Sequence, residues 1–299
     1  MRIFVLAAAV SFLASCDGPP PPPPPVEKPP PEFPGLPDIK PTEDFAKDGH
    51  LELAPGDATA FAWDLRADVH HNYSYEQESH LVVAVTGPES GRLASRTQWK
   101  GGAEVIGGGG RGEIVFLSSP IAQWNNNQPL SSEELNKVKK MLFKLQVRED
   151  GTIASRQMLS GQEDPKLDLF FALPSKELKA GEKDVREVHI ATIAEDLKYH
   201  GRQEITHAGR RKVGRHECVK LLSRVELEAN PPGDGLGKLV GWVAGYFDPK
   251  ERKFIHVDAA FVMAVDVRRQ VRPADPKAEV FWQMHRVQAD TRVTLVLKD

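Results

Sequence analysis

The chain has 299 residues, a formal net charge of −3 and an isoelectric point of about 6.4. This near balance of charge provides no basic surplus to hold a phosphate backbone, so it argues against a nucleic-acid-binding protein. Beyond residue 42 the chain is long enough for one large β domain or two small ones.

The first residues have the pattern of a secretory signal. Arg2 is the only charge among the first sixteen residues, and the run from Ile3 to Leu13 is almost wholly apolar. A basic start followed by about ten apolar residues is typical of a signal peptide. The run is shorter than the roughly twenty residues that a membrane-spanning helix needs.

The end of this run, Leu13-Ala14-Ser15-Cys16, resembles the lipobox of bacterial lipoproteins. The resemblance implies a signal peptide over residues 1–15, cleavage after Ser15 and acylation of Cys16, whose acyl chains would anchor the protein in a membrane facing the periplasm. Asp17 resembles the residue that retains lipoproteins in the inner membrane of enteric bacteria, so that membrane is slightly favoured. An outer-membrane location stays open.

Residues 16–42 are predicted to be a linker, because 13 of the chain's 24 prolines lie between Asp17 and Thr42. Proline fixes φ and lacks a backbone donor, which excludes a helix or a central strand. We expect an extended polyproline stalk, which is favoured over a proline-rich ligand for another protein.

Residues 43–175 form the predicted N-terminal β-rich half. Apolar and polar residues alternate from Phe61 to Tyr75, which predicts one long strand with Trp63, Tyr73 and Tyr75 on the same face. Further strands and a hairpin at Asp150-Gly151 are expected after it. Besides 61–75, the predicted strands in this half cover 80–86, 92–99, 113–118 and 143–147, and a further strand begins at Ile153.

Two short helices are predicted in the same half, over about 132–141 and 164–172. Ser131 and the glutamates that follow it are typical of a helix N-terminus. The glycine-rich run from Gly107 to Gly112 satisfies a dinucleotide-binding spacing, but a strand pattern follows it where phosphate binding requires a helix. We therefore interpret it as a loop.

Residues 176–299 form the predicted C-terminal antiparallel β half. The turn Asp248-Pro249-Lys250 separates two alternating segments and predicts a hairpin. A similar Leu-x-x-Gly-acid turn stands at Leu53 and at Leu178, which leaves open whether the two halves are related by duplication. The strands expected in this half cover 185–193, 199–207, 219–227, 237–247, 254–267 and 279–297.

Few residues are candidates for catalysis or metal binding. Histidines form two groups, His70, His71 and His80, and His200, His207 and His216. His207 and His216 are the candidate metal ligands, since strand parity could align them across a hairpin, but ordinary cross-strand histidines are the favoured interpretation. No catalytic residue is identified and no cofactor is expected.

These patterns predict a mainly β fold: a long-stranded antiparallel meander, curved because such sheets twist, with two short helices. The pattern resembles the half-barrels of periplasmic lipoproteins and lipid carriers. We expect a lipid-anchored, non-enzymatic binding or structural module for a lipid-like ligand or a partner protein, with Trp63, Tyr73 and Tyr75 as candidate ligand-binding residues. The alternative is a secreted hydrolase or a metal-binding envelope protein whose site is assembled only in the fold.

Overall fold

The computed structural model describes residues 52–53, 56–86, 90–161, 164–191, 198–229, 235–271 and 281–298. The predicted signal peptide, Cys16, Asp17 and the linker 16–42 lie outside these residues. All described residues belong to one compact unit, Ile39–Asp299.

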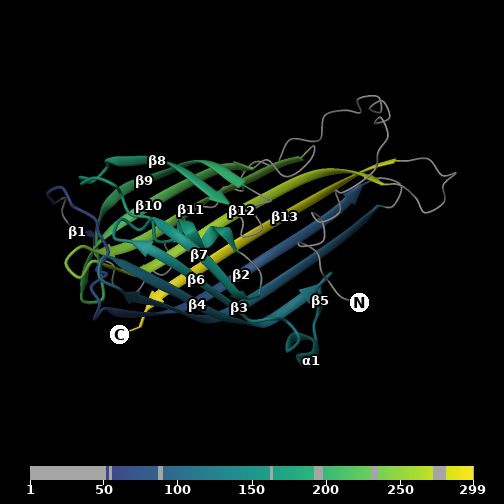
Figure 1. The fold of residues 1–299 in the computed structure, drawn as a ribbon, viewed down its shortest axis with the longest axis horizontal. Coiled ribbons are helices and arrows are strands. Elements are labelled where there is room, and N and C mark those ends of the chain that lie inside the picture. Colours follow the sequence, from purple (N-terminus) through teal and green to yellow (C-terminus); the bar gives the residue numbers. More distant parts are fainter. Residues whose placement is uncertain are drawn as a thin grey trace. The chain divides into compact units, whose positions relative to one another are not determined.

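The described part of the chain is mainly β, as predicted, and its strands form one antiparallel sheet. Figure 1 shows the long strands lying side by side. The strands are β1 (Glu52–Leu53), β2 (His70–Thr86), β3 (Gly91–Gly107), β4 (Arg111–Asn125), β5 (Gln128–Pro129), β6 (Met141–Arg148), β7 (Ile153–Ser160), β8 (Lys183–Ala191), β9 (Lys198–Val213), β10 (His216–Ala229), β11 (Gly235–Asp248), β12 (Lys253–Val271) and β13 (Phe281–Leu297).

The sheet order joins the two predicted halves edge to edge. It runs β1-β9-β10-β11-β12-β13-β2-β3-β4-β6-β7, with β8 paired to β9 and β5 paired to β4. The last strand, β13, pairs with β2 from Met284↔Thr86 to Leu297↔Tyr73. Both halves therefore share one sheet. A duplication that would relate the two halves stays a prediction.

The predicted strand from Phe61 to Tyr75 is wrong in its first part. Residues 61–66 belong to no strand, a turn follows in which the Val69 amide donates to the Arg66 carbonyl at 3.0 Å, and β2 begins at His70. The predicted parity nevertheless holds, since Phe61, Trp63, Tyr73 and Tyr75 are all buried. The alternation reflects contact with the core on both sides of a turn.

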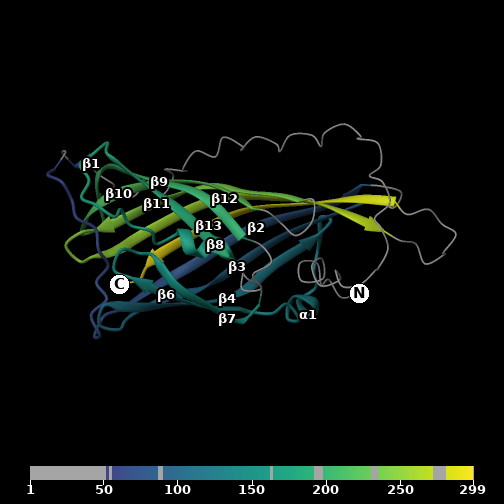
Figure 2. The ribbon, with the colours of Figure 1, turned by 45° about the horizontal axis from the view of Figure 1, so that its top comes forward.

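The two predicted helices are shorter than expected, and only one is an α-helix. Helix α1 covers Ser132–Leu135 and has the Ser131–Glu134 capping box, but it buries no residue. A helix without tertiary packing has little to extend it. The second segment is a 3-10 helix over Pro165–Leu169, with Asp164 as its N-cap. In Figure 2, α1 lies below the long strands, toward the lower right of the view.

Residues 164–178, here called the inner segment, pack against one face of the sheet, which we call the inner face. Six of its apolar side chains are at most 1% exposed: Leu167, Leu169, Phe170, Phe171, Leu173 and Leu178. The ring of Phe171 lies 6.1 Å from that of Phe116 on β4, and the Leu169 carbonyl accepts a 3.5 Å bond from Gln203 on β9.

These contacts require the sheet to curl. Strands β9 and β4 are seven steps apart in the sheet order, which corresponds to about 34 Å in a flat sheet at about 4.8 Å a step. Leu169 and Phe171, however, are only two residues apart, or about 7 Å at most. The predicted curvature is thus present, and the inner segment fills the space between strands that a flat sheet would keep apart.

The part of the chain that the structure describes contains no helix whose length and apolar character would let it span a membrane.

Candidate functional site

The three aromatic residues predicted to bind a ligand lie in the hydrophobic core. Trp63, Tyr73 and Tyr75 are at most 1% exposed. Trp63 Nε1 donates to the Phe171 carbonyl at 3.3 Å, Tyr73 Oη donates to the Phe254 carbonyl at 2.9 Å, and Tyr75 Oη donates to Gln77 Oε1. Burial raises the pKa of the Tyr73 hydroxyl well above its ordinary value.

The inner face is covered unevenly along the strands. Beside the inner segment its residues are buried, but two rows further along β3, β2, β13 and β12 are only half-buried. We call them the inner rows; they consist of Leu93, Val83, Val287 and Val265, and of Ser95, Leu81, Ala289 and Met263, each set in cross-strand register.

Polarity distinguishes the two faces at this level of the sheet. The inner rows contain no charged residue. The opposite face of the same strands carries Gln288 and an ion pair in which Arg286 Nη2 lies 2.6 Å from Asp266 Oδ2. The inner rows are thus apolar except for Ser95, whereas the opposite face, here called the outer face, mixes this ion pair and Gln288 with apolar residues such as Val82 and Ala84.

The histidines near the start of β2 do not converge. His70 is exposed and its Nδ1 lies 3.3 Å from Glu104 Oε1, while exposed His80 contacts Glu78 Oε1 at 2.9 Å. His71 is half-buried, and burial is the main cause that lowers the pKa of its imidazole. As successive residues of a strand, His70 and His71 project to opposite faces.

The two histidines named as metal ligands, His207 and His216, are not brought together. His207 pairs with Leu221 on the inner face, where its ring meets the edge of Phe61. His216 is the first residue of β10, and alternation from Val219 and Leu221 places it on the outer face. The sheet separates the two imidazoles, so they do not share an ion.

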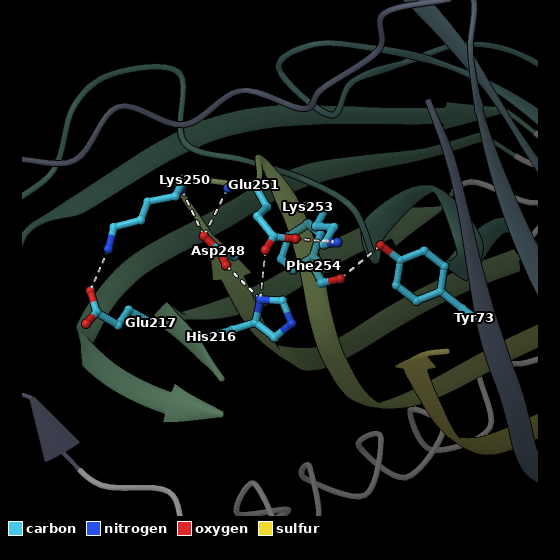
Figure 3. Close-up of polar contacts among 8 residues, drawn as sticks. All are labelled: Tyr73, His216, Glu217, Asp248, Lys250, Glu251, Lys253 and Phe254. Atoms are coloured by element: carbon cyan, nitrogen blue, oxygen red, sulfur yellow. Dashed lines mark hydrogen bonds and ion pairs between the residues drawn. The ribbon is translucent and has the colours of Figure 1, made fainter. Parts of the chain in front are cut away.

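His216 instead meets two carboxylates from the β11–β12 turn. Its Nδ1 lies 2.9 Å from Asp248 Oδ2 and 3.6 Å from Glu251 Oε1, and these three ligand atoms lie within 4.8 Å of one another. His216 and Asp248 are buried, whereas the Glu251 side chain is 45% exposed. Figure 3 shows both carboxylates approaching the same ring nitrogen. We call these residues the His216 cluster.

The turn that carries the carboxylates is held in place by the backbone. Asp248 Oδ1 accepts hydrogen bonds from the Lys250 and Glu251 amides at 2.8 and 3.1 Å. Arg252 Nη2 donates to the Trp63 carbonyl at 2.8 Å, and the Arg252 carbonyl accepts from the Asp64 amide at 2.9 Å. The Asp248 side chain is therefore fixed before any ligand arrives.

Two lysines adjoin the cluster, and each pairs with an oxygen that does not face His216. Lys253 Nζ lies 2.5 Å from Glu251 Oε2, the oxygen that faces away from His216. Lys250 Nζ lies 3.0 Å from Glu217 and is thereby directed away from Asp248 (Figure 3). Lys253 lowers the pKa of the Glu251 carboxyl, mainly through its hydrogen bond.

Cys218 lies next to the cluster but is no activated nucleophile. It follows His216 by two residues on the same face, and extending the Val219↔Phe247 register by one residue places it opposite Asp248. Its thiol is 1% exposed. Burial, followed by the charges of Asp248 and Glu251, raises the pKa of this thiol, so the reactive thiolate is suppressed at neutral pH.

Sequence reasoning found His216 but missed Asp248 and Glu251. The only sequence signal was the predicted hairpin at Asp248-Pro249-Lys250, and its carboxylates meet His216 through the pairing of β10 with β11. Comparison with known proteins offers no guide to this site, since neither a family model nor a curated protein matches the chain.

Proposed function

We propose that this protein is a lipid-anchored lipoprotein of the bacterial cell envelope, whose β domain is a non-enzymatic binding module for a lipid-like ligand. The junction Leu13-Ala14-Ser15-Cys16 and the proline-rich stretch after it support the anchor. The acylated Cys16 would hold the domain on the periplasmic side of a membrane. Asp17 favours the inner membrane over the outer.

The observation that carries the binding proposal is the pair of inner rows. Exposed apolar surface is costly in water, at about 25 cal/mol per Å², and apolar patches that persist tend to be interaction sites. The inner rows are half-buried and, except for Ser95, apolar, while the outer face of the same strands carries Arg286 and Asp266. An acyl chain, which needs no polar partner, suits such a surface.

The anchor is tested by mass spectrometry of the full chain extracted from membranes. We expect an acylated N-terminal peptide that begins at Cys16 and disappears in Cys16→Ala. A mature protein that begins elsewhere, or an unmodified Cys16, would refute the anchor.

The binding module is tested with one substitution on each face of β2. Val83 lies in the inner rows, and its neighbour Val82 pairs with Gln288 on the outer face. We expect Val83→Gln to weaken binding of a fluorescent fatty acid by about tenfold, because an apolar side chain contributes roughly 1.5 kcal/mol or more when buried. Val82→Gln is the matched control and should bind like the wild type.

The results of these experiments distinguish a lipid from a protein as the occupant of the inner rows. Phospholipid that copurifies with the wild-type protein in native mass spectrometry, and is lost in Val83→Gln, supports the lipid proposal. Equal binding by both variants, with unchanged circular dichroism, would contradict it. A protein captured through the same rows would point to the other expected class of partner.

A further inference from the structure

The His216 cluster has a geometry that one hydrogen bond does not account for. A proton on Nδ1 can satisfy Asp248 at 2.9 Å, but Glu251 at 3.6 Å lies beyond hydrogen-bond distance. Two carboxylate oxygens from different residues nevertheless approach one imidazole nitrogen. This arrangement is what ligands around a shared cation would show.

The separations agree with a metal centre. Ligand bonds of about 2.0–2.2 Å in a tetrahedral site place neighbouring donor atoms about 3.3–3.6 Å apart. Of the two nitrogen–oxygen separations, 3.6 Å lies in that range and 2.9 Å is shorter, and all three donors lie within 4.8 Å of one another. Small side-chain adjustments would therefore complete the coordination.

We propose that His216, Asp248 and Glu251 bind a divalent transition-metal ion, with zinc as the best match, and that water occupies the exposed side of the ion. This site is independent of the inner rows, because it lies on the opposite face of the sheet. Imidazole nitrogen with carboxylate oxygen suits zinc, whereas calcium and magnesium favour all-oxygen sites.

The charge balance around the cluster supports a cation. Asp248 is buried, and the positive charge of Lys253 is directed to the far oxygen of Glu251. Burying a carboxylate is costly unless its charge is compensated, and a divalent ion would neutralise both acids.

Preorganisation distinguishes this cluster from an ordinary histidine–carboxylate pair. His256 Nε2 lies 3.0 Å from Asp258 Oδ2 on β12, and among the described residues no third metal-ligating side chain completes that pair. At His216 a third donor is present, and backbone amides orient Asp248. His256 thus serves as the matched control.

The first experiment measures zinc binding by the purified full chain, with native mass spectrometry for stoichiometry and calorimetry for affinity. We expect one ion per chain. Glu251→Gln should weaken binding about tenfold or more, as loss of a ligand costs at least what loss of a second-shell partner does. Glu217→Gln, which removes an exposed glutamate from the pair with Lys250, should have no effect.

A second control addresses the ion pair that Glu251→Gln also breaks. Lys253→Gln removes the partner of Glu251 and keeps the donor. Zinc affinity that is unchanged or increased in Lys253→Gln supports direct ligation. A loss equal to that of Glu251→Gln would show that only the ion pair matters and would overturn the proposal.

Cobalt substitution tests the coordination itself. We expect Co²⁺ to give the visible absorption of a low-symmetry site in the wild type and in His256→Asn, and to lose it in His216→Asn. Circular dichroism of each variant checks that the domain remains folded. Absence of stoichiometric zinc in the wild type, or equal cobalt spectra in His216→Asn and His256→Asn, would leave the cluster as a purely structural brace and refute the metal site.

Discussion

The indole Nε1 of Trp63 donates a hydrogen bond to the carbonyl of Phe171 at 3.3 Å, and the two rings meet nearly edge-on with centroids 5.4 Å apart. Trp63 precedes β2, and Phe171 belongs to the inner segment. The same two rings both contact Phe254 on β12. This junction fixes the inner segment against β12 and against the segment that precedes β2.

We expect Trp63→Ala to lower the free energy of unfolding by about 3–5 kcal/mol, the usual cost of deleting a buried aromatic side chain. Urea unfolding followed by circular dichroism measures it. Trp124, a half-buried residue whose ring lies 5.0 Å from the Arg96 guanidinium, is the control, and Trp124→Ala should cost about 1 kcal/mol. Trp63→Ala with full stability but weaker fatty-acid binding would instead place Trp63 in a ligand site.

Gly151, in the β6–β7 turn, has no space for a side chain. Its φ is +74°, and an added Cβ would lie 2.0 Å from the Phe171 carbonyl oxygen. Gly181 has a similar φ of +87°, but nothing lies within 4 Å of its added Cβ.

Alanine substitutions at Gly151 and Gly181 distinguish the cost of a strained backbone conformation from the cost of a steric clash. Gly181→Ala should cost about 1–2 kcal/mol, the penalty for a left-handed conformation. Gly151→Ala should cost more, because the inner segment must also shift. Equal unfolding free energies for the two variants would mean that the inner segment adjusts freely around Gly151.

Much of the sheet was predictable because alternation reports burial directly. The face that runs from Val257 to Val267 and the hairpin at Asp248-Pro249-Lys250 were expected and are present in β12 and the β11–β12 turn. The same alternation wrongly predicted a strand over Phe61–Leu65, where residues contact the core from outside the sheet. Alternation records which side chains are buried, and it does not record whether the backbone pairs.

The His216 cluster could not be predicted, because its members are far apart in sequence. His216 and Asp248 are separated by 32 residues and meet through the register of β10 with β11. The expected partner, His207, lies on the other face because β9 is irregular between the residues that pair with Val219 and Leu221. A bulge of this kind leaves no clear mark in a strand pattern.

His207 should make stability depend on pH. Burial is the largest cause that lowers the pKa of its imidazole, and the Arg210 charge acts in the same direction, while Glu182 opposes them. The unfolded chain, with a histidine pKa of about 6.5, then binds more protons than the folded one. The free energy of unfolding should fall as the pH drops through about 6.5 towards the lower folded pKa, and stay level above it.

The variant His207→Asn tests this dependence. Its amide oxygen can replace Nδ1, which accepts the Gly209 amide at 3.1 Å, but it does not titrate. We expect a shallower loss of stability between pH 8 and pH 5, measured by urea unfolding at each pH. His80→Asn, which removes an exposed histidine, should keep the wild-type slope. A wild-type slope in His207→Asn would show that other groups, such as His71, dominate.

The two parts of the chain, 43–175 and 176–299, should not fold separately. Phe170 and Phe171 of the first part pack against Phe261 and Phe254 of the second, and β2 pairs with β13 across the boundary. Each fragment alone would expose these apolar groups and an unpaired strand edge. We expect either fragment alone to lack a cooperative urea transition, and the two coexpressed to recover it. Cooperative unfolding of residues 43–175 by themselves would instead favour two independent, duplicated halves.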